Sequence, residues 1–102
     1  MNKQEQLALA NEISDIVYHL LDKKGDDYAN EDRLSNFKRV ASILGKEPID
    51  ICLTLIGIKI ARITNLMNKD ARNESMEDSI QDLITYSYLL KMIHAEQRTD
   101  NN

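Results

Sequence analysis

The chain has 102 residues, of which 42% are hydrophobic and 29% are charged, the balance of one soluble domain with a modest core. Its net charge of −4 argues against general binding to nucleic acid backbones, and its single cysteine, Cys52, excludes a disulfide within the chain. The N-terminal residues have no continuous apolar core, and residues 49–63 are too short and too charged for a membrane span. We therefore expect a cytoplasmic protein without a signal peptide or a membrane contact.

The first two helices are predicted from apolar residues at helical spacing. Helix one is expected from about Lys3 to Lys23, where Gly25 would end it. Helix two is expected to begin near Asn30, a good N-cap, and to end at Gly45 in the left-handed conformation.

The third and fourth helices follow a turn at "KEP". Pro48 fits the first turn of helix three, which is expected to run to about Asn68. Ser75 is the expected N-cap of helix four, which would end near Gln97. The sequence thus predicts an all-α, compact four-helix domain over residues 1–98, followed by a frayed tail at 99–102.

Helices three and four carry more apolar surface than a small bundle can cover. Helix three is apolar on nearly every side, and helix four has two stripes on roughly opposite sides. We expect at least a homodimer formed through these two helices, and a tetramer or hexamer is compatible with the same pattern. The alternative is a monomer that is slightly over-hydrophobic.

Charged residues stand on these same two helices. Lys59 and Arg62 lie three residues apart and share a face that Asn65 continues. Asp78 and Asp82 lie four residues apart on helix four. They either form ion pairs with the side chains of Lys59 and Arg62 as a structural network, or share a metal ion such as Mg²⁺. Glu74, just before the expected cap, is a third candidate ligand for that metal.

A polar bend, "KGDDYANED", precedes helix two. Its residues are ordinary for a surface turn. A tyrosine can also stack on a nucleotide base, however, and an asparagine can form hydrogen bonds with the polar edge of a base. His19 and His94 have no partner at metal-ligand spacing, so we expect both to be structural or exposed. Cys52 is expected to be a small buried hydrophobe. Neither a glycine-rich phosphate loop nor a nucleophile–base pair is evident.

Three segments in order, "KKGDDYANEDRLSNFKRVASILG", "IKIARITNL" and "ESMEDSIQDLITYSYLL", resemble the nucleotide modification associated domain of bacteriophages. That family is distantly similar to the MazG-type all-α nucleoside triphosphate pyrophosphohydrolases. The resemblance implies a helical oligomer with a nucleotide pocket between helices, in the cytoplasm of an infected host if the chain is phage-encoded.

The resemblance also implies roles for individual residues. Lys59 and Arg62 would face phosphates, while Glu74, Asp78 and Asp82 would hold Mg²⁺ or anchor those cations. Asp27 and Tyr28 would close the site. The full set of candidate ligand-binding residues comes from the polar bend and the three segments: Lys24, Asp27, Tyr28, Asn36, Lys59, Arg62, Asn65 and Tyr86.

The sequence departs from this pattern where catalysis would need acids. Relatives often carry an acid just before the lysine, where this chain has Ile58, and no E-x-x-E is followed by a clean E-x-x-D. We therefore predict a protein that binds or sequesters a nucleotide, such as a cyclic signal made by host defence. The first alternative is a Mg²⁺-dependent nucleoside triphosphate pyrophosphohydrolase, and the second is a structural helical interaction protein.

Overall fold

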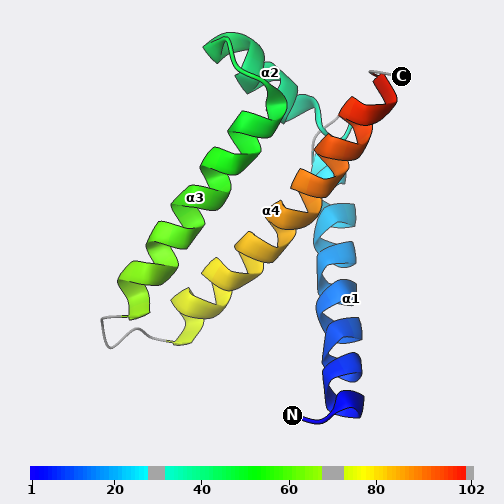
Figure 1. Ribbon diagram of the computed structural model, residues 1–102, viewed down its shortest axis with the longest axis vertical. Coiled ribbons are helices and arrows are strands. Elements are labelled where there is room, and N and C mark those ends of the chain that lie inside the picture. Colours follow the sequence, from blue (N-terminus) through cyan, green and yellow to red (C-terminus); the bar gives the residue numbers. More distant parts are fainter. Residues whose placement is uncertain (28–31, 68–72, 101–102) are drawn as a thin grey trace. The chain divides into compact units, whose positions relative to one another are not determined.

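The computed structural model describes residues 1–27, 32–67 and 73–100, with side chains described at 1–23, 32–67 and 75–99. These residues form four α-helices and no strand, which confirms the predicted all-α class. The helices are α1 (Lys3–Asp27), α2 (Ser35–Leu44), α3 (Pro48–Met67) and α4 (Asn73–Asp100) (Figure 1). Contacts divide the chain into two compact units, residues 1–33 and 34–102. The expectation of one domain over residues 1–98 stays a prediction, and the frayed tail lies partly outside the described residues.

The first unit is built on α1. Asn2 begins the helix by hydrogen bonding in both directions with Glu5: the Glu5 N–H donates to Asn2 Oδ1 at 2.8 Å, and Asn2 Nδ2 donates to Glu5 Oε1 at 3.0 Å. The prediction that Gly25 ends the helix is wrong, because the helix continues to Asp27. A single glycine inside a helix costs only about 1 kcal/mol, which does not force a long helix to stop.

The second unit begins with α2, whose start differs from the prediction. The helix begins at Ser35 rather than near Asn30, which lies outside the described residues. Leu34 precedes the first turn without a side-chain cap, and only 8% of its surface is exposed. Packing of Leu34 in the core, rather than a polar cap, therefore fixes this end.

The end of α2 agrees with the prediction at Gly45. Its φ of 65° is left-handed, and its N–H donates to the Ser42 carbonyl at 3.4 Å. The N–H of Lys46 donates to the Ala41 carbonyl at 2.8 Å, which completes a Schellman motif. The chain can therefore turn sharply into α3.

Helix α3 starts at Pro48 and ends at Met67, close to the predicted limits. Asp50 Oδ2 accepts a hydrogen bond from the Glu47 N–H at 3.1 Å, which satisfies a free donor near the helix start. Helix α4 begins at Asn73, so the prediction of Ser75 as N-cap is wrong. Residue types alone do not fix a helix start to within one or two positions when several polar residues stand near it. The helix runs past the expected end at Gln97 to Asp100.

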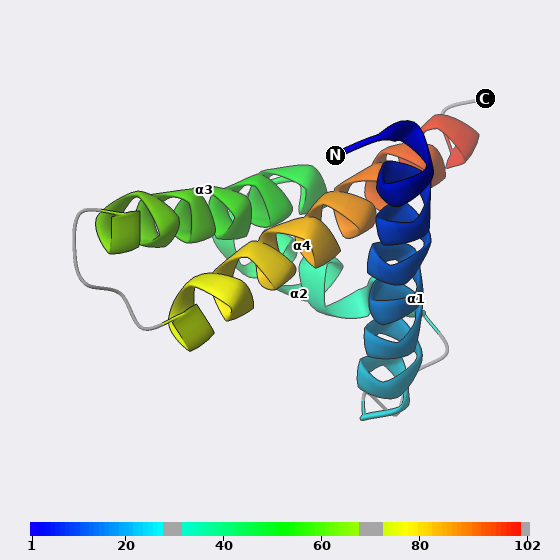
Figure 2. The ribbon, with the colours of Figure 1, turned by 90° about the horizontal axis from the view of Figure 1, so that it is seen from below.

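The core of the second unit lies where α3 and α4 run side by side, with α2 packed against α3 (Figures 1 and 2). Its buried residues are Leu34, Cys52 and Ile93. Six partly buried side chains pack around them: Phe37, Ile49, Ile56, Tyr86, Leu89 and Leu90. Each of the three helices contributes to this cluster, which holds the α3–α4 pair in one register.

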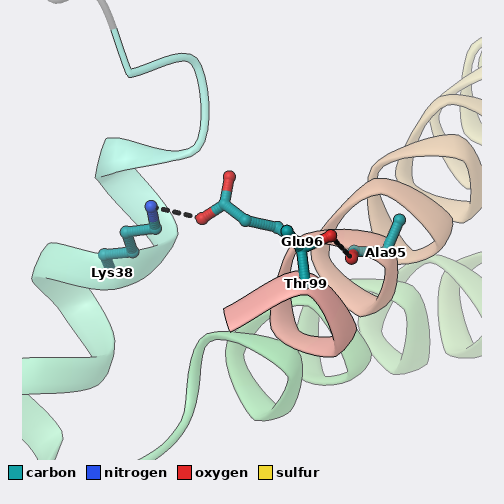
Figure 3. A network of polar contacts seen from close by, with 4 residues as sticks. All are labelled: Lys38, Ala95, Glu96 and Thr99. Carbon is teal, nitrogen blue, oxygen red and sulfur yellow. Dashed lines mark hydrogen bonds and ion pairs between the residues drawn. The ribbon is translucent and has the colours of Figure 1, made fainter. Parts of the chain in front are cut away.

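Polar contacts reinforce this packing. Lys38 on α2 forms an ion pair with Glu96 on α4, which joins these two helices (Figure 3). Within α4, Thr99 Oγ1 donates to the Ala95 carbonyl at 3.1 Å. Cys52 has no exposed surface, which confirms the prediction that it is buried. Its thiol donates to the Tyr86 carbonyl at 3.4 Å, and burial raises the pKa of the Cys52 thiol above its ordinary value of 9.0.

Candidate functional site

The candidate site centres on one ion pair between α3 and α4. Lys59 Nζ lies 2.9 Å from Asp82 Oδ2, and the two side chains expose 19% and 38% of their surface. Lys59 stands seven residues after Cys52 and Asp82 four before Tyr86, so the pair continues the stripe that forms the core. Hydrophobic packing sets the register of the helices, and this register brings the two charges together.

Arg62 and Asn65 follow Lys59 along α3. Both side chains are exposed, whereas Lys59 is half-buried. Among the described residues, Arg62 takes part in no ion pair or side-chain hydrogen bond. The site therefore presents a positive charge to solvent one turn from a lysine that is already held by a carboxylate.

Asp78 stands one turn before Asp82 on α4, and its side chain is exposed. The side chain of Glu74, the third predicted metal ligand, lies outside the described residues. Within the described parts of the chain, no three His, Cys, Asp or Glu side chains are grouped as metal ligands. Of the two interpretations that the sequence leaves open for Asp82, the ion pair with Lys59 is present, and the Mg²⁺ site stays a prediction.

The remaining predicted residues lie in three different settings. The side chains of Lys24, Asp27 and Tyr28 are outside the described residues. Asn36 is exposed on α2, and no interaction within the described residues joins it to Lys59 or Asp82. Tyr86 is half-buried and packs against the core cluster. The structure thus brings Lys59 and Asp82 together, with Tyr86 one helical turn further along α4.

Sequence reasoning missed Ser79. Only 2% of its surface is exposed, and it lies three residues before Asp82 on the stripe that includes Tyr86. The signal was available, since this spacing places a small polar side chain on the buried side of α4.

Across the described residues, no helix combines the length and the apolar character needed to cross a membrane. Comparison with known proteins found no matching family model and no significantly similar curated protein or solved structure.

Proposed function

We propose that the protein binds a nucleotide in the cytoplasm through the α3–α4 pair, and that it sequesters this ligand rather than hydrolysing it. The observation that carries the proposal is the half-buried Lys59, held at 2.9 Å by Asp82, with the exposed Arg62 one turn away. The carboxylate of Asp82 fixes Lys59 in place, and Arg62, which has no ion-pair partner among the described residues, offers a fork of donors that fits phosphate oxygens. The resemblance to the phage nucleotide modification associated domain supports the same ligand class.

The proposal favours binding over hydrolysis because of the residue types on α3 and α4. Cleavage of a phosphoanhydride needs metal ions to neutralise charge and to activate water. Ile58 stands where an acid would be expected, and its side chain is 55% exposed. Asp82 is already engaged by Lys59, which leaves Glu77 and Asp78 as the acids nearby on α4 among the described side chains.

We also propose that the protein acts as a homo-oligomer through α3 and α4. Large apolar side chains are exposed on both helices, including Leu53 (49%), Ile58 (55%), Ile60 (50%) and Ile80 (40%). Burial of such side chains is worth about 1.5–3 kcal/mol each when it is complete, so covering them favours association.

Titration calorimetry with a panel of linear and cyclic nucleotides tests the binding proposal, and product analysis with Mg²⁺ tests the hydrolysis alternative. We expect a heat of binding for at least one nucleotide without conversion of that nucleotide. Catalytic release of pyrophosphate would contradict sequestration and would support the alternative that the protein is a pyrophosphohydrolase. A panel that gives no heat and no product would leave the structural helical interaction protein as the better account.

A further inference from the structure

Arg62 on α3 and Asp78 on α4 lie at the same level of the helix pair. The two helices run in opposite directions (Figures 1 and 2), and Lys59 meets Asp82 between them. Arg62 follows Lys59 by three residues, and Asp78 precedes Asp82 by four. Each step is about one helical turn, so the two side chains come to the same height and turn towards the same edge of the pair. Both are exposed there, and no ion pair joins one to the other.

The charged side chains around this level do not add up to a positive site. From Lys59 to the end of α3 there are two cations, Lys59 and Arg62, and the described side chains of α4 up to Asp82 include three acids, Glu77, Asp78 and Asp82. Residues 68–74, which lead from α3 into α4, have two basic and two acidic residues in their sequence, so they leave the balance unchanged. A ligand with several negative charges therefore meets no net positive field here.

We propose that Asp78 selects the ligand by its charge, and that the site takes a nucleotide whose phosphate is a phosphodiester, linear or cyclic. A phosphodiester carries one negative charge, whereas a terminal phosphate carries about −1.5 to −2 at pH 7 and a triphosphate carries more. This inference rests on the nucleotide binding proposed above, and it assigns to Asp78 a role in specificity that the proposed function does not include.

The chemistry of Arg62 fits a phosphodiester. A guanidinium donates two parallel hydrogen bonds to a pair of oxygens that share one charge, and a phosphodiester has two free oxygens of this kind. Lys59 has three N–H donors, of which the contact with Asp82 engages one, so donors remain for the same phosphate. Each further charge on the phosphate would instead meet the carboxylate of Asp78, which repels it at short range.

Titration calorimetry of the full-length protein, in EDTA and at low salt, compares ligands that differ mainly in the charge of the phosphate. For each common base, the cyclic mononucleotide and the dinucleoside monophosphate supply a phosphodiester, and the monophosphate and triphosphate supply a higher charge. We expect one phosphodiester, cyclic or linear, to bind at least about tenfold more tightly than the triphosphate of its base. Because salt screens exposed charges, added salt should narrow this ratio.

Asp78 and Glu77 provide matched variants, since each change removes one negative charge from the same turn of α4. Glu77 stands five residues before Asp82, so it points to another side of the helix from Asp78. Asp78→Asn should narrow the preference for the phosphodiester about threefold to fivefold, and Glu77→Gln should change it less than about twofold. Asp78→Glu keeps the charge and should keep the preference. The ratio is measured within each variant, so a partial loss of folded protein does not alter it.

The outcomes separate this inference from the binding proposal. A monophosphate or triphosphate that binds more tightly than both phosphodiesters in EDTA overturns the charge selection and leaves nucleotide binding in place. Equal narrowing in Asp78→Asn and Glu77→Gln overturns the role of Asp78. Binding that requires Mg²⁺ and is abolished in Asp78→Asn also overturns it, because Asp78 is then a metal ligand. If no ligand binds with or without Mg²⁺, both proposals fail.

Discussion

Lys59 on α3 and Asp82 on α4 meet at 2.9 Å across a helix pair whose other contacts are mainly apolar. The lysine is the more buried partner, with 19% of its side chain exposed against 38% for the aspartate. This asymmetry means that loss of one partner has different consequences from loss of the other. A buried cation without a partner is more costly than an exposed carboxylate without one.

We therefore expect Asp82→Ala to destabilise the fold more than Lys59→Met. The first change leaves Lys59 unpaired and costs about 1–2 kcal/mol, while the second leaves an aspartate that water can solvate and costs less than about 1 kcal/mol. Urea denaturation of both variants and of the double variant measures the difference. A larger loss for Lys59→Met would contradict the assignment of Lys59 as the more buried partner.

Arg62 should contribute to ligand affinity and not to stability. Its side chain is exposed and has no ion-pair partner among the described residues. For the nucleotide found in the calorimetric panel, we expect Arg62→Ala to weaken binding about tenfold, with an unchanged urea midpoint. Arg39→Ala, which removes an exposed arginine from α2, is the control for a change in net charge. Equal losses of nucleotide affinity in the two variants would show that Arg62 acts only through the net charge of the protein.

Cys52 should make stability depend on pH above neutrality. Burial raises the pKa of its thiol above 9.0, so the unfolded chain loses this proton at a lower pH than the folded chain does. The contribution is fully present below about pH 9 and is lost as the pH rises towards the folded-state pKa. Cys52→Ala should lose this alkaline dependence while costing about 1 kcal/mol at neutral pH for the missing sulfur. Parallel alkaline slopes in the two proteins would exclude a role for the thiol.

Gly45 should resist replacement because its φ of 65° is left-handed. Gly45→Ala should destabilise the fold by about 1 kcal/mol, since a Cβ is strained in this conformation. Gly45→Asn should cost less, because asparagine visits the left-handed region more readily. Thermal unfolding of the two variants checks the order, and a more stable alanine variant would contradict the assigned turn.

Local chemistry explains which features the sequence could predict. Pro48 and Gly45 mark helix boundaries through their own backbone preferences, and both predictions agree with the structure. The starts of α2 and α4 differ from the prediction because several cap-forming residues stand near each boundary, so residue type alone does not select one. At Ser35, the buried Leu34 decides the start.

Long-range register explains what the sequence could not predict. The spacing of Asp78 and Asp82 placed both on α4, but it could not tell whether Lys59 or a metal ion would engage them. The ion pair of Lys38 with Glu96 went unpredicted because it depends on how α2 packs beside the end of α4. Which side chains meet across two helices depends on how the whole core packs. The spacing of residues within one helix carries no information about that packing.

Native mass spectrometry of the protein, purified without denaturation, tests the central claim of nucleotide binding most directly. We predict that the wild type carries a retained mass that is released as a nucleotide on denaturation, and that Arg62→Ala retains less of it while Arg39→Ala does not. Wild-type protein that is free of nucleotide, and that stays free after incubation with linear and cyclic nucleotides, would contradict the account.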